Sequence, residues 1–194
     1  MRGIEHIPWL YDATMSLMER GPLGRWRRWL TSNVRGRVLE IGCGTGRNLP
    51  LYVEPPVAFD PDLACVRVAR SRAPHARLLV ASAEALPFRN GAFDTIVSSL
   101  VLCSVGDPLA AVRELRRVLA PGGSLRALEH VRGGGFRGRV QDAIQPFWTW
   151  LNGGCHPNRD TESTLTRGGF AIGERNADGV MRRLVCRASS QLAV

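Results

Sequence analysis

Residues 38–48 read VLEIGCGTGRN, and this stretch decides the fold. An apolar run around Glu40 has the pattern of a buried strand, and Gly42, Gly44 and Gly46 follow it at alternate positions. Glycines in a strand-to-helix turn let the backbone take positive φ, and they let a ligand approach without meeting a Cβ atom. The stretch therefore predicts a strand that leads into a ligand-binding turn.

Short apolar runs of the same kind recur along the chain. They predict strands at residues 38–41, 57–60, 77–81, 94–99 and 124–131, with two more near 170–176 and 180–188. Helical patterns lie between them at about 62–72 and 108–119. Strands that alternate with helices and are almost wholly apolar are typical of a parallel sheet buried on both faces. We therefore expect an α/β fold, with a Rossmann-like, doubly wound, mostly parallel seven-stranded sheet and helices on both faces.

The two ends of the chain differ from this central block. Residues 9–31 have apolar side chains at helical spacing, which predicts two short helices, with residues 9–18 as a lid. Residues 132–138 (RGGGFRG) are expected to form a flexible turn before a helix at 140–151, which Pro146 would kink. Asn158 or Asp160 is expected to cap a further helix that Gly168 or Gly169 ends.

A length of 194 residues suits one domain. We expect residues 1–35 to form the helical lid, 36–131 the ligand-binding core, and 132–194 the last helices and strands. Apolar residues make up 44% and charged residues 22% of the chain, as in a globular protein.

The charge is strongly positive, since 26 basic residues, all arginine, face 17 acidic ones. The excess is concentrated at the ends: residues 1–37 and 132–194 each carry a net charge of +4, against +1 for residues 38–131. Such an excess suits contact with phosphates or anionic surfaces. Arg25, Arg27 and Arg28 lie beside tryptophans and suggest at most weak contact with an anionic membrane surface.

The cysteines are single and scattered, at positions 43, 65, 103, 155 and 186. An odd count without a CxxC pair predicts neither a disulfide framework nor a metal site. No stretch approaches 18 apolar residues, and the N-terminal segment lacks the apolar run of a secretion signal. We therefore expect a cytoplasmic protein.

The glycine turn excludes some nucleotide ligands. A dinucleotide fingerprint places a third glycine where this chain has Arg47, and a phosphate-binding loop needs a lysine that the chain lacks. Asp60 ends the next predicted strand, where an acid accepts hydrogen bonds from ribose hydroxyls. A nucleoside ligand without pyrophosphate remains.

Four ordered blocks, EIGCGTG, FDPD, AEALPFRNGAFD and RRVLAPGG, together resemble the class I S-adenosylmethionine-dependent methyltransferases over about residues 36–131. The resemblance implies that the glycines border the methionine part of this cofactor, that Glu40 orients its amino group, and that Asp60 holds the ribose. Residues 82–84 would lie against adenine, and Ser98 and Ser99 near the sulfonium. The implied cofactor-binding residues are Glu40, Gly42, Cys43, Gly44, Gly46, Asp60, Pro61, Ser82, Ala83, Glu84, Ser98 and Ser99. Many relatives have an aspartate where this chain has Ser82.

Further blocks, SSLVLCSV and QPFWTWLNGGCHPNRDT, resemble the alkyl-thiol S-methyltransferases and their bacterial relatives over about residues 94–170. This likeness implies a small lipophilic methyl acceptor, with a thiol favoured and S-adenosylhomocysteine as the second product. Quinone and phospholipid methyltransferases share the earlier blocks. The motifs of nucleic-acid base methylation are absent, which disfavours nucleic acid, and a catalytically silent cofactor-binding module remains an alternative. Nothing in the sequence indicates a protein partner.

Methyl transfer from a sulfonium depends more on positioning the reactants and excluding water than on a strong base. His130 and His156 are the candidate catalytic residues, because histidine is the usual proton-transfer group near pH 7. Tyr11, Trp148 and Cys155 are expected to line the acceptor pocket. We expect Asp94 to be structural, and Arg113, Arg116 and Arg117 to form a solvated surface.

Overall fold

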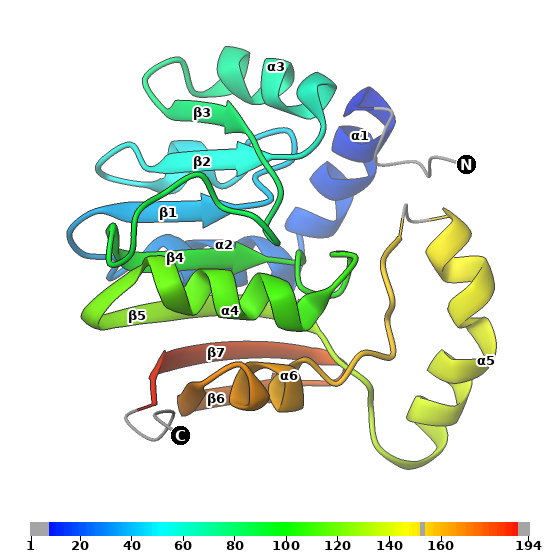
Figure 1. The fold of residues 1–194 in the computed structure, drawn as a ribbon. Coiled ribbons are helices and arrows are strands. Elements are labelled where there is room, and N and C mark those ends of the chain that lie inside the picture. The colour runs from blue at the N-terminus through cyan, green and yellow to red at the C-terminus, as the bar shows by residue number, and fades with distance from the viewer. Residues whose placement is uncertain (1–7, 152–153, 190–194) are drawn as a thin grey trace.

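The computed structural model describes residues 8–151 and 154–189, and these residues form one sheet of seven strands (Figure 1). The strands are β1 (Val38–Ile41), β2 (Val57–Asp60), β3 (Arg77–Val80), β4 (Phe93–Ser99), β5 (Leu119–His130), β6 (Phe170–Asp178) and β7 (Met181–Ala188). Their order is β3-β2-β1-β4-β5-β7-β6. β7 alone runs in the direction opposite to the other six strands. The predicted doubly wound, mostly parallel fold is confirmed.

Helices cover both faces of the sheet. α2 (Pro22–Thr31) and α3 (Leu63–Arg72) pack on one face, and α4 (Pro108–Val118) and α6 (Thr161–Arg167) pack on the other. Alternate strand residues enter opposite cores: Ile96 packs with Leu115 of α4, whereas Val97 packs with Leu30 of α2. This explains why the central strands carry apolar residues on both faces.

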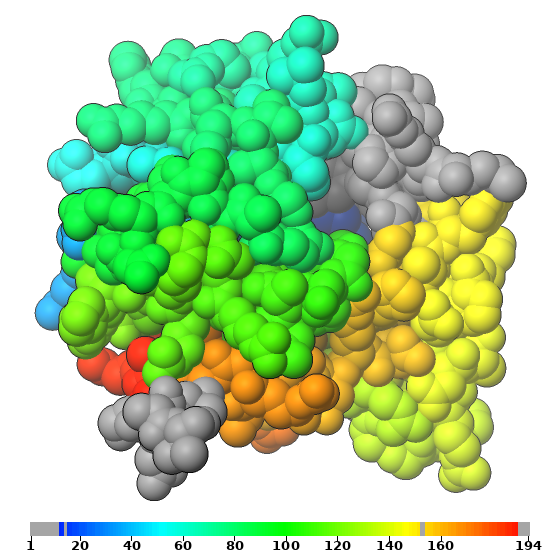
Figure 2. Space-filling model, in the orientation of Figure 1, coloured from blue at the N-terminus to red at the C-terminus, as the bar shows by residue number. Residues whose placement is uncertain are grey.

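Two helices stand apart from these layers. α1 (Pro8–Glu19) and α5 (Gly135–Leu151) lie at the edge toward which the parallel strands point (Figure 1). A short 3₁₀ helix, Leu49–Leu51, follows the glycine turn. Figure 2 shows α5 as a ridge along one side of the molecule. Ligands of doubly wound sheets bind at this carboxyl edge, so these two helices flank the region where the site is expected.

Several predicted boundaries were wrong. β5 begins at Leu119 because the segment that leads to Gly123 continues the pairing with β4, although with an irregular register. α5 begins at Gly135, so half of the expected flexible turn is helical, and Pro146 lies inside the continuous helix. The predicted ends of α6 are confirmed: of the two alternatives at each end, Asp160 caps the helix by accepting a hydrogen bond from the Ser163 N–H group, and Gly168 ends it.

Within the part of the chain that the structure describes, no helix is both long enough and apolar enough to cross a lipid bilayer.

Candidate active site

The three glycines after β1 serve different purposes. A Cβ atom at Gly42 would lie 2.5 Å from Val101 Cγ2, and one at Gly46 would lie 2.9 Å from the Cα atom of Ala69 in α3. At Gly44, where φ is +53°, a Cβ atom would meet nothing within 4 Å. Gly42 and Gly46 thus allow close packing, whereas Gly44 borders open space that a ligand can enter. Gly46 supplies the helix contact that a dinucleotide fingerprint assigns one position later.

The glycine turn is joined to the end of β2. The Gly44 N–H group donates to Asp60 Oδ2 at 2.8 Å, and the Asp62 N–H group donates to Asp60 Oδ1 at 2.9 Å. The Cys43 N–H group donates to the Phe59 carbonyl at 2.8 Å, while the Cys43 side chain packs in the core. Asp60 is half-buried and the next residue, Pro61, is exposed, so this carboxylate lies at the surface of the same edge.

Glu40 lies deeper than its neighbours in sequence. Its side chain is buried, and its Oε1 accepts a hydrogen bond from Asn48 Nδ2 at 2.9 Å. Burial raises the pKa of Glu40 to about 7, although the Tyr52 hydroxyl, Asn48 and the charge of Arg27 act against this shift. Through Asn48, the Glu40 carboxyl is therefore bonded to the end of the glycine turn.

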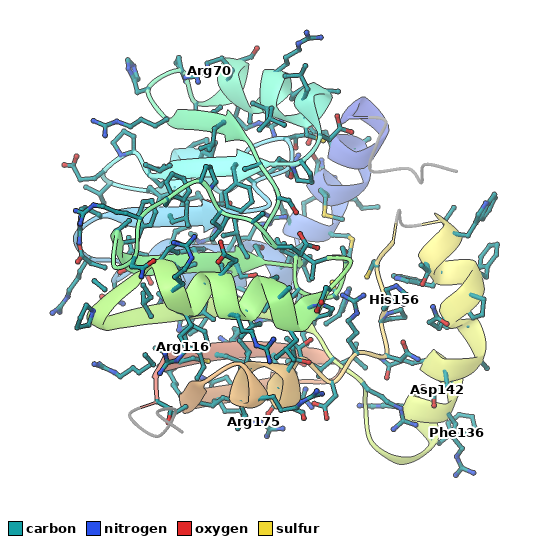
Figure 3. All side chains as sticks on the ribbon, in the orientation of Figure 1. Arg70, Arg116, Phe136, Asp142, His156 and Arg175 are labelled. Carbon is teal, nitrogen blue, oxygen red and sulfur yellow. The ribbon has the colours of Figure 1, made fainter. Side chains whose placement is uncertain are left out.

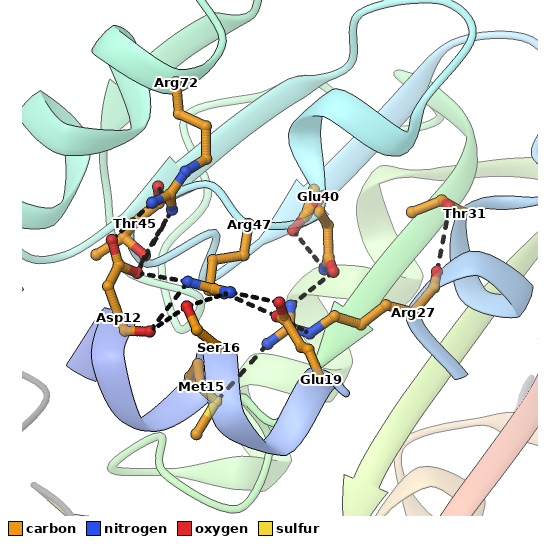
Figure 4. A network of polar contacts seen from close by, with 11 residues as sticks. Asp12, Met15, Ser16, Glu19, Arg27, Thr31, Glu40, Thr45, Arg47 and Arg72 are labelled. Carbon is orange, nitrogen blue, oxygen red and sulfur yellow. Dashed lines mark hydrogen bonds and ion pairs between the residues drawn. The ribbon is translucent and has the colours of Figure 1, made fainter. Parts of the chain in front are cut away.

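Ion pairs attach α1 to the glycine turn (Figure 4). Asp12 accepts from Thr45 Oγ1 at 2.7 Å and from Arg72 Nη2 at 2.6 Å, and it pairs with Arg47 Nη1 at 3.2 Å. Partial burial acts to raise the pKa of Asp12, but the hydrogen bonds from Arg72, Thr45 and Arg47 outweigh it and hold this pKa below its usual value. Glu19 is shared in the same way between Arg47 and Arg27. Arg47 is thus part of this network.

A buried carboxyl organises the loop after β4. Ser98 donates its hydroxyl hydrogen to Glu129 Oε1 at 2.6 Å, and the N–H groups of Val101 and Leu102 donate to the same oxygen at 3.2 Å each. Burial raises the pKa of Glu129. Ser98 is fully buried, so its hydroxyl serves Glu129, whereas Ser99 is only half-buried.

The segment after β3 is hydrogen-bonded to the loop that precedes α4. Ser82 donates its hydroxyl to Glu84, and Glu84 Oε1 accepts from the Gly106 N–H group at 2.9 Å. Ala83 between them is buried in the core. The two polar residues at this predicted adenine position therefore bond to each other and to the loop before α4.

The acceptor-side residues meet where α5 approaches the ends of β4 and β5. Cys155 Sγ lies 3.6 Å from Cys103 Sγ and 3.9 Å from His130 Nδ1, and the Trp148 ring stands edge-on to His130. The hydrogen bond shared by the two sulfurs lowers the pKa of Cys155 and raises that of Cys103. The structure thus brings His130, Trp148 and Cys155 together; that Trp148 and Cys155 line an acceptor pocket stays a prediction. Tyr11 lies outside the residues whose side chains are described.

His156 follows Cys155 on the segment that leads back from α5 toward the sheet (Figure 3). The backbone N–H group of His156 donates to the Cys103 carbonyl at 2.8 Å, and its ring Nδ1 lies 3.1 Å from Gln145 Nε2. Burial, and then the charge of Arg159, lower the pKa of His156, so the ring is neutral at neutral pH. A neutral ring held by Gln145 is suited to orienting a ligand.

Known proteins match this arrangement. The sequence model of a protein family, described as a methyltransferase domain, matches residues 39–127. Human thiol S-methyltransferase TMT1B is 32% identical over 164 residues, which cover 75% of this chain and 67% of that protein. The chain belongs to the class I S-adenosylmethionine-dependent methyltransferases.

Other relatives of this methyltransferase have different acceptors in their names. Demethylmenaquinone methyltransferase of Renibacterium salmoninarum is 35% identical over 136 residues, covering 66% of this chain and 57% of that protein. A S-adenosylmethionine-dependent methyltransferase of Thermotoga maritima has the same fold, with a TM-score of 0.76 at 21% identity over 94% of this chain and 97% of that one. These relatives share the family and the methyl donor, S-adenosylmethionine, and differ in the methyl acceptor that they are named for.

Several arginines of this methyltransferase have internal partners. Arg116 donates to the carbonyls of Gly169 and Ser189, and Arg117 pairs with Glu114, so the expectation of a solvated surface was wrong for both, while Arg113 is exposed. Arg27 is buried against Glu19, which removes one of the three arginines assigned to membrane contact.

Asp94 is structural, as expected, because its carboxylate pairs with Arg37 and accepts the Arg37 backbone N–H. Sequence reasoning missed Cys103, Glu129 and Val101 as parts of the site. Cys103 and Cys155 are 52 positions apart, and no local spacing connects them.

Proposed function

We propose that this methyltransferase moves a methyl group from S-adenosylmethionine to a small, lipophilic acceptor, with a thiol favoured. The observation that carries the proposal is the position of two features on one sheet edge. The glycine turn with its open side at Gly44 and the group of His130, Trp148 and Cys155 are joined by the loop after β4, because Val101 of this loop packs on Gly42.

The residues of the glycine turn fit the methyl donor of the family. Gly44 leaves room for a ligand to approach the backbone, and Asp60 is half-buried at the end of β2, where a carboxylate can accept hydrogen bonds from ribose hydroxyls. Ser82 and Ala83 would contact the base, and Ser99 would lie near the reacting end. The bound donor supplies an activated methyl group, and the protein supplies position and exclusion of water.

The chemistry of the acceptor side supports a thiol. A thiol with a pKa of about 8.5 supplies some thiolate at neutral pH, so no strong base is needed. His130 is half-buried and faces the cluster with Nδ1, and we assign to it the role of base or orienting donor. His156, held by Gln145, would orient the acceptor. Trp148 would provide apolar contact area.

We further infer that α1 is the lid of the donor site. Its acids contact Thr45 and Arg47 of the glycine turn, so α1 must stay in place or move as a unit when a ligand enters. A clamp of ion pairs at a partly buried surface suits a segment that closes over a polar ligand.

The test is to incubate the protein with isotope-labelled S-adenosylmethionine and panels of alkyl and aryl thiols, quinols, amino-lipids and total RNA. Mass spectrometry of the products is expected to show label on a small thiol. Label on a quinol or an amino-lipid alone would contradict the thiol assignment, and label on RNA alone would contradict the small acceptor. Absence of label together with cofactor binding in calorimetry would favour a silent cofactor-binding module.

A further inference from the structure

Three side chains from distant parts of the chain converge at the acceptor side. Cys103 follows β4, His130 ends β5, and Cys155 lies between α5 and α6. The two sulfurs and a ring nitrogen of His130 all lie within 4.8 Å of one another. Both cysteines are buried and reduced, and His130 is half-buried. These are three soft or borderline ligands that point at a common centre.

Their spacing agrees with tetrahedral metal coordination. With Zn–S bonds of about 2.3 Å and a Zn–N bond of about 2.05 Å, a tetrahedral ion separates two sulfurs by about 3.8 Å and a sulfur from a nitrogen by about 3.6 Å. The observed separations are 3.6 Å between the sulfurs and 3.9 Å between Cys155 Sγ and His130 Nδ1. The third separation, between Cys103 Sγ and the His130 ring nitrogen, lies within 4.8 Å, so a side-chain movement of at most about 1.2 Å would complete the geometry.

We propose that Cys103, His130 and Cys155 bind a thiophilic divalent cation, zinc in the first place, whose fourth position takes the sulfur of the methyl acceptor. This inference rests on the proposed function, since it names the way in which that site activates a thiol: His130 then acts as a ligand that holds the cation, and the cation takes the place of a base. Three protein ligands and an open position are the pattern of catalytic zinc, whereas structural zinc sites have four protein ligands.

The surroundings are consistent with two thiolates. A divalent cation balances the charge of two coordinated thiolates, which in a buried site would otherwise be costly. Arg159 lies beside the cysteines, but its Nη1 is engaged by the carbonyls of Leu102 and Val105 at 2.8 and 2.7 Å. The buried Glu129 bonds to the same loop, since its Oε1 accepts from Ser98 and from two backbone N–H groups. These neighbours fix the loop that carries Cys103.

The site is also connected to the donor side. Val101 packs on Gly42 of the glycine turn and lies two residues before Cys103 in the same loop. A sulfur held at the cluster would therefore approach the donor site from the acceptor side of the sheet edge. An in-line displacement needs the two reactants held next to each other, and this loop links the two places that would hold them.

The reaction balances without an oxidant or a reductant. The acceptor R–SH gives its proton to solvent when its sulfur binds the cation, because a coordinating thiol is deprotonated. A sulfur electron pair then forms the bond to the methyl carbon while the bond from that carbon to the sulfonium sulfur breaks. The products are the thioether R–S–CH₃ and S-adenosylhomocysteine, and the uncharged thioether leaves because it is a weaker ligand than a thiolate.

Cobalt(II) titration tests the site directly. The full chain is stripped with a chelator in the presence of a phosphine reductant, and the thiolate-to-cobalt charge-transfer band is followed in the near ultraviolet. We expect saturation at equimolar cobalt. Cys103→Ala and Cys155→Ala should each weaken binding by about 100-fold or more, and His130→Ala should weaken it too. Cys186→Ala removes another buried cysteine, in β7, and should leave the titration unchanged.

Thermal melting and cofactor calorimetry show which variants are folded. A band that survives in both folded cysteine variants would overturn the site, as would a Cys103–Cys155 disulfide without metal under reducing conditions. A change in the cobalt spectrum on addition of a simple alkyl thiol is expected, and an unchanged spectrum would overturn the open fourth position.

Activity separates this inference from the proposed function. If metal-free protein methylates thiols at the full rate, the metal site is wrong and the proposed function stands. If cobalt binds through the cysteines but no thiol is methylated, the site stands and the proposed acceptor is wrong.

Discussion

The two helices at the carboxyl edge of the sheet are held in different ways. α1 is attached by charge, since Asp12 and Glu19 pair with Arg47 of the glycine turn. α5 is attached by a buried amide, since Gln141 donates to the carbonyls of Val131 and Pro157, and by a more exposed ion pair between Asp142 and Arg132. On its outer side α5 exposes large apolar residues, namely Phe136, Val140, Ile144, Phe147 and Trp150.

We assign the side of α1 to the methyl donor and the side of α5 to the methyl acceptor. The donor side combines a rigid glycine turn, a carboxylate at Asp60 and an ionic clamp, all of which suit one polar cofactor. The acceptor side presents sulfur, imidazole and aromatic groups around Cys155, which suit a small apolar molecule with one reactive atom. The relatives vary in the acceptor that they are named for. Four substitutions break one side and leave the other intact.

The largest effect is expected at Gly44. Gly44→Val places a side chain in the space next to the turn, so we expect cofactor affinity in calorimetry to fall by at least about 100-fold, or about 2.7 kcal/mol. Gly122→Val is the matched control, because Gly122 also has positive φ and open space around its Cβ position. Equal loss of cofactor binding in both variants would mean that backbone strain, and not ligand space, explains the effect.

Asp60 comes next. Asp60→Ala removes a carboxylate that we assign to the ribose, and charge-assisted hydrogen bonds of this kind contribute about 1.5–3 kcal/mol, which is roughly 10-fold to 150-fold in affinity. Asp178→Ala in the β6–β7 hairpin removes an exposed acid and should change nothing. Unaltered cofactor binding in calorimetry would refute the ribose assignment.

His130 tests the acceptor side alone. His130→Ala should lower methyl transfer to a thiol at least about tenfold, while the dissociation constant of the cofactor stays unchanged because the glycine turn is intact. His75→Ala, at an exposed position before β3, is the control. Normal turnover of the His130 variant would exclude this histidine from the mechanism.

The smallest effect is expected for the clamp on α1. Asp12→Asn weakens the pairs with Arg72 and Arg47, so trypsin should cleave after the exposed Arg20 several-fold faster at neutral pH, whereas Glu54→Gln should have no effect. An unchanged cleavage rate would show that α1 is held by packing.

The clamp also predicts a pH dependence. Because the fold lowers the pKa of Asp12, its contribution to stability is complete above the ordinary value of 3.8 and is lost as the pH falls through the lower folded value. Thermal melting of wild type and Asp12→Asn should therefore converge in acid and differ at neutral pH.

Local patterns predicted the sheet well but its boundaries less well. The central strands were recognisable because they are buried on both faces and therefore have consecutive apolar residues, as at Ile96 and Val97. The start of α5 at Gly135 was missed because three glycines precede Phe136, and glycine disfavours helices unless contacts compensate. Here the fold compensates, since Gln141 binds the Gly133 N–H group at 2.6 Å.

The sequence by itself determined the fold class, the glycine turn, the position of Asp60 at the end of a strand and the family, because each depends on residues that are close together in the chain and follow a strand or helix period. The tertiary structure decided which distant side chains meet. Only the folded chain places Cys103 beside Cys155 and engages Arg116 and Arg117 internally. The sheet order, which sets β5 beside β4 and brings the following loops to one edge, is a long-range packing result that no local pattern encodes.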